Sequence, residues 1–249
     1  MELLEDRVVV ITGAGDIGAA VMTAMVGHGA RVTVWDRHAG LLEDLPEGVT
    51  GNVVDVTSDD GVVRATDAAI RSEGRLDVLV NTAGVLTSGA VSEMSTDLWQ
   101  ETIDINLSGV FRCCRAVAGH MIDRRSGSIV NISSTGGLRG AADLAHYCAS
   151  KFGVIGLSES LAREVGQYGV RVNCVCPGAV ESAMNTTTLA AMARRAGCSY
   201  EAVEDSIITN TALRRLVQPA DVANAAVFLA SDLSSGITGA ALPVSGGLF

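Results

Sequence analysis

The chain has 249 residues, of which 48% are hydrophobic and 4% aromatic, and its formal net charge is −10. This length suits one large α/β domain, and the acidic balance offers no basic surface for nucleic acid or for an anionic membrane. No apolar run approaches the roughly 18 residues of a membrane span, and the acidic N-terminus is unlike a signal peptide. We therefore expect a cytoplasmic protein that forms a single domain over residues 1–249.

The six cysteines and four histidines are scattered along the chain. They form no CxxC pair and no spacing typical of a metal site. We therefore expect no bound metal ion, and thiols that are reduced and mostly buried.

Short β-branched runs alternate with longer amphipathic stretches along the chain. The predicted strands are Val8–Thr12, Arg31–Trp35, Thr50–Val54, Val78–Asn81, Ser128–Ile132, Val170–Val175 and Ala241–Val244. The predicted helices are Ile17–His28, Asp59–Glu73, Thr96–Met121, Ala145–Tyr168 and Ala220–Ala230. Continuous apolar strands are typical of a parallel sheet that is buried on both faces. The alternation predicts a single-domain Rossmann fold, a doubly wound α/β structure whose mostly parallel seven-stranded sheet is flanked by helices.

Residues 182–216 interrupt this alternation. The segment is long, rich in Thr, Ala and Arg, and lies between two predicted core elements. Long insertions of this kind are usually lids or binding loops. We interpret it as a substrate lid, and a plain surface helical hairpin is the alternative.

Three glycines follow the first predicted strand and open the first helix. Gly13, Gly15 and Gly18 form a G-x-G-x-x-G run in the strand–turn–helix context that a dinucleotide site requires. Such glycines permit a tight turn and let the backbone approach a pyrophosphate, whose charge the helix N-terminus stabilises. The turn therefore predicts a dinucleotide site.

The end of the second predicted strand bears on the choice of nucleotide. A carboxylate there, as at Asp36, can accept both adenosine-ribose hydroxyls and would repel the extra phosphate of NADP. Arg37 is a contrary signal, because an arginine at this place can bind that phosphate. The glycine turn carries no Lys or Arg and contains Asp16. Two acidic groups against one arginine favour NAD, with NADP as the alternative.

A Tyr–Lys pair lies further along the chain. Tyr147 and Lys151 are four residues apart, so on a helix they share one face. A free tyrosine has a pKa of about 10 and is a poor base at pH 7, but a nearby cation stabilises its phenolate. Ser134 follows a predicted strand, where ligand-facing groups of open α/β sheets gather. Its hydroxyl can hydrogen-bond a substrate oxygen.

Taken together, the chain resembles the short-chain dehydrogenase/reductase family over nearly its full length. The motifs that carry the resemblance are "ITGAGDIG", Asp36, "DV" at Asp55–Val56, "NTAG" at Asn81–Gly84, "INLSGVF" with Asn106, Ser134, "YCASK" and "CPGAVES".

The resemblance implies a catalytic tetrad of Asn106, Ser134, Tyr147 and Lys151. Tyr147 would be the general acid/base, and Ser134 would orient the substrate oxygen. Lys151 would lower the pKa of Tyr147 and hold the nicotinamide ribose, while Asn106 would support a water that relays the proton. Hydride would pass between the substrate carbon and the nicotinamide.

The resemblance also implies a set of cofactor contacts. They comprise the glycine turn, the ends of the strands that follow it, the Tyr–Lys pair and the turn beside the nicotinamide. The expected residues are Gly13, Gly15, Asp16, Ile17, Gly18, Asp36, Arg37, Asp55, Val56, Asn81, Ala83, Gly84, Tyr147, Lys151, Pro177, Gly178, Val180 and Ser182.

Three departures from the family pattern stand out. The glycine turn is one residue shorter than T-G-x-x-x-G-x-G, and Asp16 within it either caps its helix or discourages a 2′-phosphate. Ser245 replaces the acidic residue that usually precedes the double glycine near the C-terminus. Cys148, which directly follows Tyr147, either lines the substrate pocket or packs away from it.

The substrate is less well defined than the chemistry. The expected pocket residues mix apolar and polar groups, namely Leu86, Leu138, Arg139, Ala141, His146, Cys148, Met184 and Asn185. We expect an NAD-dependent alcohol dehydrogenase for a small or medium secondary alcohol, such as a polyol or a cyclic alcohol, or for its ketone. The alternatives are an NADPH-dependent carbonyl or 3-oxoacyl reductase and a non-catalytic nucleotide sensor. The resemblance also implies a homotetramer, or less often a dimer, built partly from the two longest predicted helices.

Overall fold

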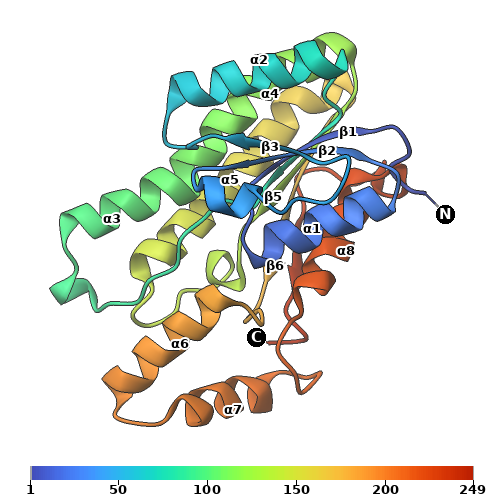
Figure 1. Ribbon diagram of the computed structural model, residues 1–249. Coiled ribbons are helices and arrows are strands. Elements are labelled where there is room, and N and C mark those ends of the chain that lie inside the picture. The colour runs from blue at the N-terminus through green and yellow to red at the C-terminus, as the bar shows by residue number, and fades with distance from the viewer. Residues whose placement is uncertain (1, 249) are drawn as a thin grey trace.

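The computed structural model describes residues 2–248, so Met1 and Phe249 of the expected domain lie outside the described residues. Within residues 2–248 a seven-stranded parallel sheet forms the middle layer, in the order β3-β2-β1-β4-β5-β6-β7 (Figure 1). The strands are β1 (Val8–Thr12), β2 (Arg31–Asp36), β3 (Thr50–Val53), β4 (Val78–Asn81), β5 (Gly127–Ile132), β6 (Val170–Pro177) and β7 (Ala241–Val244). The predicted Rossmann architecture is confirmed.

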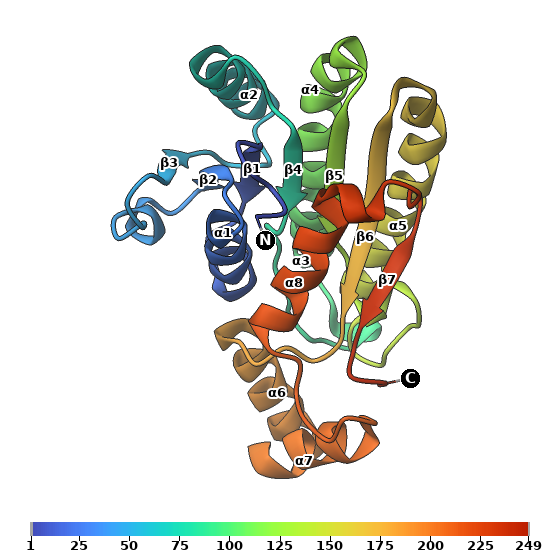
Figure 2. The same ribbon diagram turned by 90° about the vertical axis from the view of Figure 1, so that its right-hand side faces the viewer.

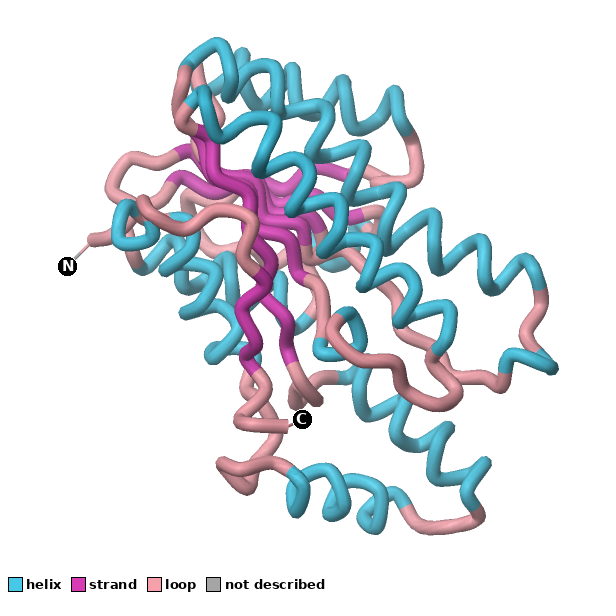
Figure 3. Tube along the Cα trace, turned by 180° about the vertical axis from the view of Figure 1, so that it is seen from behind, coloured by secondary structure: helices cyan, strands magenta, loops and turns pink. Residues whose placement is uncertain are grey.

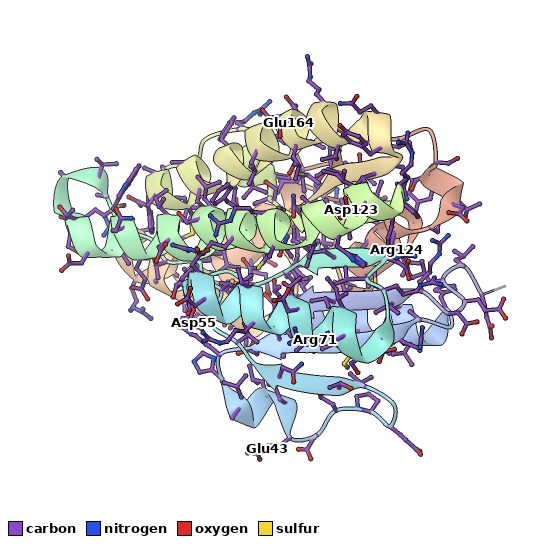
Figure 4. All side chains as sticks on the ribbon, turned by 90° about the horizontal axis from the view of Figure 1, so that it is seen from above. Glu43, Asp55, Arg71, Asp123, Arg124 and Glu164 are labelled. Carbon is purple, nitrogen blue, oxygen red and sulfur yellow. The ribbon has the colours of Figure 1, made fainter. Side chains whose placement is uncertain are left out.

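Helices cover both faces of the sheet (Figure 2). The helices α1 (Asp16–Gly27) and α8 (Pro219–Ala230) pack together on one face. On the other face α2 (Asp59–Glu73), α4 (Gly109–Arg124) and α5 (Ala145–Val165) run side by side (Figure 4). The short helix α3 (Thr96–Ile103) precedes α4. Seen from behind, the sheet lies between these two helical layers (Figure 3).

The first strand shows why the apolar runs of this sequence are continuous. All five residues of β1 are buried, and successive side chains of a strand point to opposite faces. Val9 and Ile11 pack in the cluster that contains residues of α1 and α8, whereas Val10 packs in the cluster beneath α2, α4 and α5. Because each face meets its own helical layer, neither face needs polar residues.

The helix predicted over residues 96–121 is divided. It forms α3, then a π-helical segment at Asp104–Ser108, then α4. A π-helical turn is widened by one residue, and such turns occur often at functional sites. Hydrophobic periodicity does not reveal this local change, because apolar residues continue on both sides of it. The segment places Asn106, which is fully buried, in the molecular interior.

Several other boundaries differ from the predictions by one to three residues, and two of them have a clear structural cause. Helix α5 ends at Val165 and continues as one 3-10 turn at Gly166–Tyr168, because Gly169 leaves the helix in the left-handed region at φ +74°. Strand β6 extends to Pro177 rather than Val175, since it pairs with β7 as far as Val244.

Residues 182–216 contain two helices, α6 (Ala183–Ala196) and α7 (Tyr200–Asn210). They lie below the sheet in Figure 2, beyond the carboxyl ends of β6 and β7. The two ends of the segment are joined by a bridge between Val180 and Val217. The segment is therefore a pair of helices whose two connections to the rest of the chain lie next to each other.

The cysteines are free thiols across the described part of the chain, and Cys198 is the exposed one among them. Residues 2–248 contain no cluster of His, Cys, Asp and Glu that could hold a metal ion. Among these same residues, no helix combines the length and the apolar character that crossing a bilayer requires.

Candidate active site

A cleft with a volume of about 390 Å³ lies at the carboxyl ends of the strands. Most of the expected cofactor residues line it, as do Ser134, Tyr147 and Lys151. Of the described residues that we expected in catalysis or cofactor binding, Asn81 and Asn106 do not line the cleft. Ligands of open α/β sheets bind at this edge, where the strand order reverses. The fold therefore gathers residues that are far apart in the sequence into one cleft.

The glycine turn packs too closely for side chains at two of its three glycines. Gly13 has φ +86°, and a Cβ there would lie 2.9 Å from the backbone nitrogen of Ala83. A Cβ at Gly18 would lie 1.9 Å from the carbonyl oxygen of Gly13. At Gly15, by contrast, an added Cβ would meet no described atom within 4 Å. The turn is therefore closed toward the protein and open toward the cleft.

The N-terminus of α1 suits a pyrophosphate. Its N-cap residue is Gly15, which has no side chain that could cap the helix. The first N–H groups of a helix lack intrahelical partners, and together with the helix dipole they favour an anion. The turn therefore fits the pyrophosphate of a dinucleotide.

The end of β2 carries the carboxylate that bears on the nucleotide. Asp36 Oδ2 accepts a hydrogen bond from the Ala14 N–H at 2.8 Å, and Oδ1 accepts one from the His38 N–H at 2.8 Å. The imidazole Nδ1 of His38 lies 3.2 Å from the same Oδ1. Arg37 also lines the cleft, and its positive charge lowers the pKa of Asp55. A carboxylate and an arginine thus lie side by side at the end of the cleft where we expect the adenosine ribose.

Asp55 and Val56 line the cleft after β3. Burial alone would raise the pKa of the Asp55 carboxyl, but hydrogen bonds from Thr57 and the charges of Arg37 and Arg112 together lower this pKa below its usual value. The Thr57 N–H donates at 2.9 Å and its hydroxyl at 2.8 Å. Asp55 is therefore held as an ordered carboxylate.

Asn81 lies beneath the cleft rather than in it. It is 2% exposed, and its amide donates to Asn131 Oδ1 at 2.8 Å. Asn131 in turn donates to the Ser158 hydroxyl at 2.8 Å, which links β4 through β5 to α5. Buried polar groups of this kind stabilise one arrangement when each has a partner. Asn81 stiffens the sheet beside the site.

Tyr147 and Lys151 lie one turn apart on α5, as the i, i+4 spacing predicted. The Lys151 Nζ lies 5.7 Å from the centre of the Tyr147 ring and donates to the Ile132 carbonyl at 2.9 Å. Burial lowers the pKa of Lys151 to about 8. Burial raises the pKa of Tyr147, and a hydrogen bond from Ser134 opposes this rise. In this structure the tyrosine is therefore a protonated phenol at neutral pH, with a hydroxyl and a cation beside it.

The side chain of Asn106 is fully engaged within the protein. Its Oδ1 accepts from the Val85 N–H at 2.8 Å, and its Nδ2 donates to the Val85 carbonyl at 2.9 Å and to the Ser150 hydroxyl at 3.2 Å. These bonds hold the segment after β4 against the π-helical turn. The direct role of the side chain is thus to position the cleft wall.

The turn after β6 and the start of α6 form the end of the cleft where we expect the nicotinamide. Pro177, Gly178, Val180 and Ser182 line it. The Ser182 hydroxyl accepts a hydrogen bond from the Asn185 N–H at 3.2 Å, so this side chain caps α6. It also lies 3.4 Å from the Val180 carbonyl, to which it can donate.

The expected substrate residues divide into two groups. Leu86, Met184 and Asn185 line the cleft. The other five lie outside the cleft that the described residues form: Leu138, Arg139, Ala141, His146 and Cys148. His146 is fully buried and its Nε2 lies 2.8 Å from the Thr87 hydroxyl, while Leu138 is 43% exposed. Sequence proximity to Tyr147 does not decide which way a neighbouring helical side chain points.

Several cleft residues were not anticipated from the sequence. They include His38, Leu41, Thr82, Val85, Ser133 and Ala183. Most of them adjoin a predicted site residue in the chain. Extending the carboxyl end of each predicted strand by two residues would have found Thr82 and Ser133 but not the other four.

Comparisons with known proteins agree with this geometry. Residues 13–249 match the family model described as enoyl-(acyl carrier protein) reductase. The chain is 36% identical over 255 residues to the 3-oxoacyl-[acyl-carrier-protein] reductase FabG of Chlamydia muridarum, covering 99% of this chain and 98% of that protein.

Two solved structures share the fold over nearly the whole chain. One is an NAD⁺-bound xylitol dehydrogenase, with a TM-score of 0.94 and 28% identity over 98% of this chain and 99% of that one. The other is an actinorhodin polyketide ketoreductase variant with NADPH, with a TM-score of 0.94 and 35% identity over 100% and 99%. The protein belongs to the short-chain dehydrogenase/reductase family and is an oxidoreductase that acts on alcohol or ketone groups with NAD or NADP.

Proposed function

We propose that this protein is an NAD-dependent oxidoreductase that interconverts a secondary alcohol and its ketone, with Tyr147 as the general acid/base. The observation that carries the proposal is one continuous cleft, with Tyr147, Lys151 and Ser134 at one end and Asp36 at the other. The bound dinucleotide would supply the acceptor or donor of the hydride.

In the proposed mechanism the Tyr147 hydroxyl exchanges a proton with the substrate oxygen. Ser134, whose hydroxyl opposes the rise in the pKa of Tyr147, orients that oxygen. The ammonium of Lys151 stabilises the phenolate that forms when Tyr147 acts as a base, because an opposite charge favours the ionised form. Burial opposes this ionisation in the protein alone, so the cationic environment of the complete site has to outweigh it. We assign the water-holding role of Asn106 to its backbone, since its side chain is engaged with Val85 and Ser150.

Asp36 supports the preference for NAD. Its carboxylate is fixed at the end of β2 by two backbone N–H groups, where it would accept ribose hydroxyls and repel a 2′-phosphate. NADPH is the alternative, which Arg37 and the similarity to FabG favour. The two structural relatives bind NAD⁺ and NADPH respectively, so similarity alone favours neither nucleotide.

A small or medium secondary alcohol is the proposed substrate class, with polyols and cyclic alcohols as its leading members. Leu86 and Met184 supply apolar contacts in the cleft, and Asn185 supplies an amide. A 3-oxoacyl substrate is the second candidate, since the FabG similarity favours it.

A panel of secondary alcohols and ketones, followed by nicotinamide absorbance with NAD(H) and NADP(H), tests the proposal. The panel includes polyols, cyclic alcohols and a 3-oxoacyl thioester. NAD-linked oxidation of a polyol or cyclic alcohol is the expected result. Turnover confined to NADPH and the thioester would replace this proposal with the second candidate.

We also propose a homotetramer. The family resemblance implies it, and exposed aromatic side chains on two long helices support it: Phe111 on α4 is 44% exposed and Phe152 on α5 is 47% exposed. Such side chains are often covered by a partner subunit. A solution mass equal to one chain would contradict this proposal.

A further inference from the structure

One hydrogen bond joins the two walls of the cleft. Asp16 Oδ2 accepts from the Ala183 N–H at 2.8 Å. Asp16 lies within the glycine turn and is the first residue of α1, whereas Ala183 is the first residue of α6. Both residues line the cleft. This bond therefore connects the expected dinucleotide turn directly to the segment 182–216.

The bond suits both partners chemically. The Ala183 N–H is one of the first N–H groups of α6, which lack partners within the helix. The Ser182 hydroxyl accepts from Asn185, so the two side chains bind different N–H groups at this helix end. A carboxylate at a helix N-terminus is also stabilised by the helix dipole. Asp16 belongs to α1 and caps α6, an arrangement that neither of our two expectations for this residue included.

Other contacts hold α6 further along. The Thr188 hydroxyl lies 3.4 Å from the Leu86 carbonyl. Near the C-terminal end of α6, Arg195 lies 3.3 Å from a Glu93 carboxylate oxygen and 3.5 Å from one of Asp143. These contacts attach the helix to the substrate side of the cleft. The contact of Asp16 differs from them because it attaches the helix to the glycine turn.

We propose that Asp16 is a positioning residue that fastens the segment 182–216 to the glycine turn before a nucleotide binds. By fixing the first turn of α6, it holds Met184 and Asn185 in the wall of the cleft. The turn that receives the nucleotide thereby also sets the position of the substrate wall. The proposal that Met184 and Asn185 face a substrate rests on the proposed function, whereas the fastening itself does not.

Hydrogen–deuterium exchange of the nucleotide-free protein tests the fastening. In Asp16→Ala, peptides from residues 183–196 are expected to exchange several-fold faster than in the unmodified protein, because local opening of α6 becomes easier. Asp16→Asn is expected to fall between the two, since its amide oxygen still accepts but carries no charge. Asp16 is exposed, so β1 peptides should keep their exchange rates and report that the fold is intact.

Asp60→Asn is the matched control, because Asp60 is an exposed acid in the first turn of α2. This variant should leave exchange in residues 183–196 unchanged. Unchanged exchange of these residues in Asp16→Ala would overturn the proposal. If exchange stayed unchanged in Asp16→Ala but the nucleotide affinity changed, Asp16 would influence the nucleotide through its charge alone.

Steady-state kinetics give a second, separate readout. Asp16→Ala is expected to raise the KM for the alcohol several-fold at saturating nucleotide while kcat changes little, since α6 would bind substrate less well without altering the reacting groups. A lowered kcat with an unchanged KM would contradict the positioning role. If no alcohol or ketone is turned over, the proposed function fails, and the exchange experiment still decides the fastening.

Discussion

The carboxylate of Asp36 accepts a hydrogen bond from the backbone N–H of Ala14 at 2.8 Å, which ties the end of β2 to the glycine turn. The turn is one residue shorter than the family pattern. The bond fixes the position of Ala14 within this turn. The same carboxylate is the group to which we assign the preference for NAD. Its structural and its selective roles can therefore be separated by substitution.

For Asp36 we predict that removing the charge weakens the preference for NADH over NADPH about tenfold or more, which corresponds to about 1.4 kcal/mol. Asp36→Asn removes the charge but keeps an oxygen that can accept from Ala14, whereas Asp36→Ala removes both. Dissociation constants from fluorescence titration with both nucleotides provide the measurement. An unchanged preference in both variants would show that another group discriminates between the nucleotides.

For Tyr147 we predict that Tyr147→Phe lowers kcat by about 10²–10⁴-fold, the usual contribution of a general acid/base. The dissociation constant for NADH should stay near that of the unmodified protein, because the ring remains. Tyr168→Phe is the matched control, since Tyr168 packs against Arg125 outside the cleft. Retained turnover in Tyr147→Phe would rule out the assigned mechanism.

The third glycine of the turn should tolerate no side chain. In Gly18→Ala the new Cβ would lie 1.9 Å from the Gly13 carbonyl oxygen, so the turn must move. We predict a lower melting temperature and a large loss of NADH affinity. Gly27→Ala on the same helix has no described atom within 4 Å of its Cβ and should be neutral or stabilise by up to about 1 kcal/mol. Equal effects of the two substitutions would contradict this account.

At the amino ends of the strands, Asp77 is a buried ion-pair centre. Its carboxylate accepts from the Val8 N–H at 2.9 Å, from Arg75 at 2.6 Å and from Arg124 at 3.0 Å. Figure 4 places Arg124 near the opposite end of the molecule from Asp55 of the cleft.

We predict that Asp77→Ala lowers the free energy of unfolding by about 3 kcal/mol, because it leaves the partners of a buried carboxylate unpaired. Asp232→Asn breaks the exposed pair with Arg7 and should cost less than about 1 kcal/mol. Urea unfolding measures both, and a loss in Asp77→Ala as small as that in Asp232→Asn would refute the prediction.

The protonation of His120 is expected to make the free energy of unfolding depend on pH in the mildly acidic range. Burial lowers the pKa of His120, and the charge of Arg124 lowers it further. Its Nε2 accepts a hydrogen bond from the Leu76 N–H at 3.1 Å, which requires the neutral ring. Since the folded-state pKa lies below the unfolded value of about 6.5, the unfolded state binds more protons in that range.

The stability contributed by neutral His120 is therefore present above about pH 6.5 and lost as the pH falls below it. His120→Gln offers an acceptor that does not titrate, so we predict a smaller loss of melting temperature between pH 7 and pH 5. An identical acid slope in the variant and the unmodified protein would show that other groups dominate.

The alternation of apolar strands and amphipathic helices predicted the parallel sheet, because burial on both faces leaves a continuous hydrophobic signature in each strand. The glycine turn and the Tyr–Lys spacing predicted two parts of the cleft, since both depend on local backbone geometry, and the family resemblance supplied most of its other residues. Local geometry, by contrast, gave no sign of the π-helical turn around Asn106 or the engagement of its side chain with Val85.

The sequence by itself determined the fold class, the family and most of the cleft residues, because these follow from periodicity and from motifs of fixed spacing. The tertiary structure alone decided which neighbours of Tyr147 face the cleft, since helix rotation turns His146 inward toward Thr87. It also decided the role of Asp16, whose partner Ala183 is distant in the chain and is brought close because β1 and β6 end on the same side of the parallel sheet. Contacts between segments this far apart depend on packing of the whole chain, and local sequence carries no signal for them.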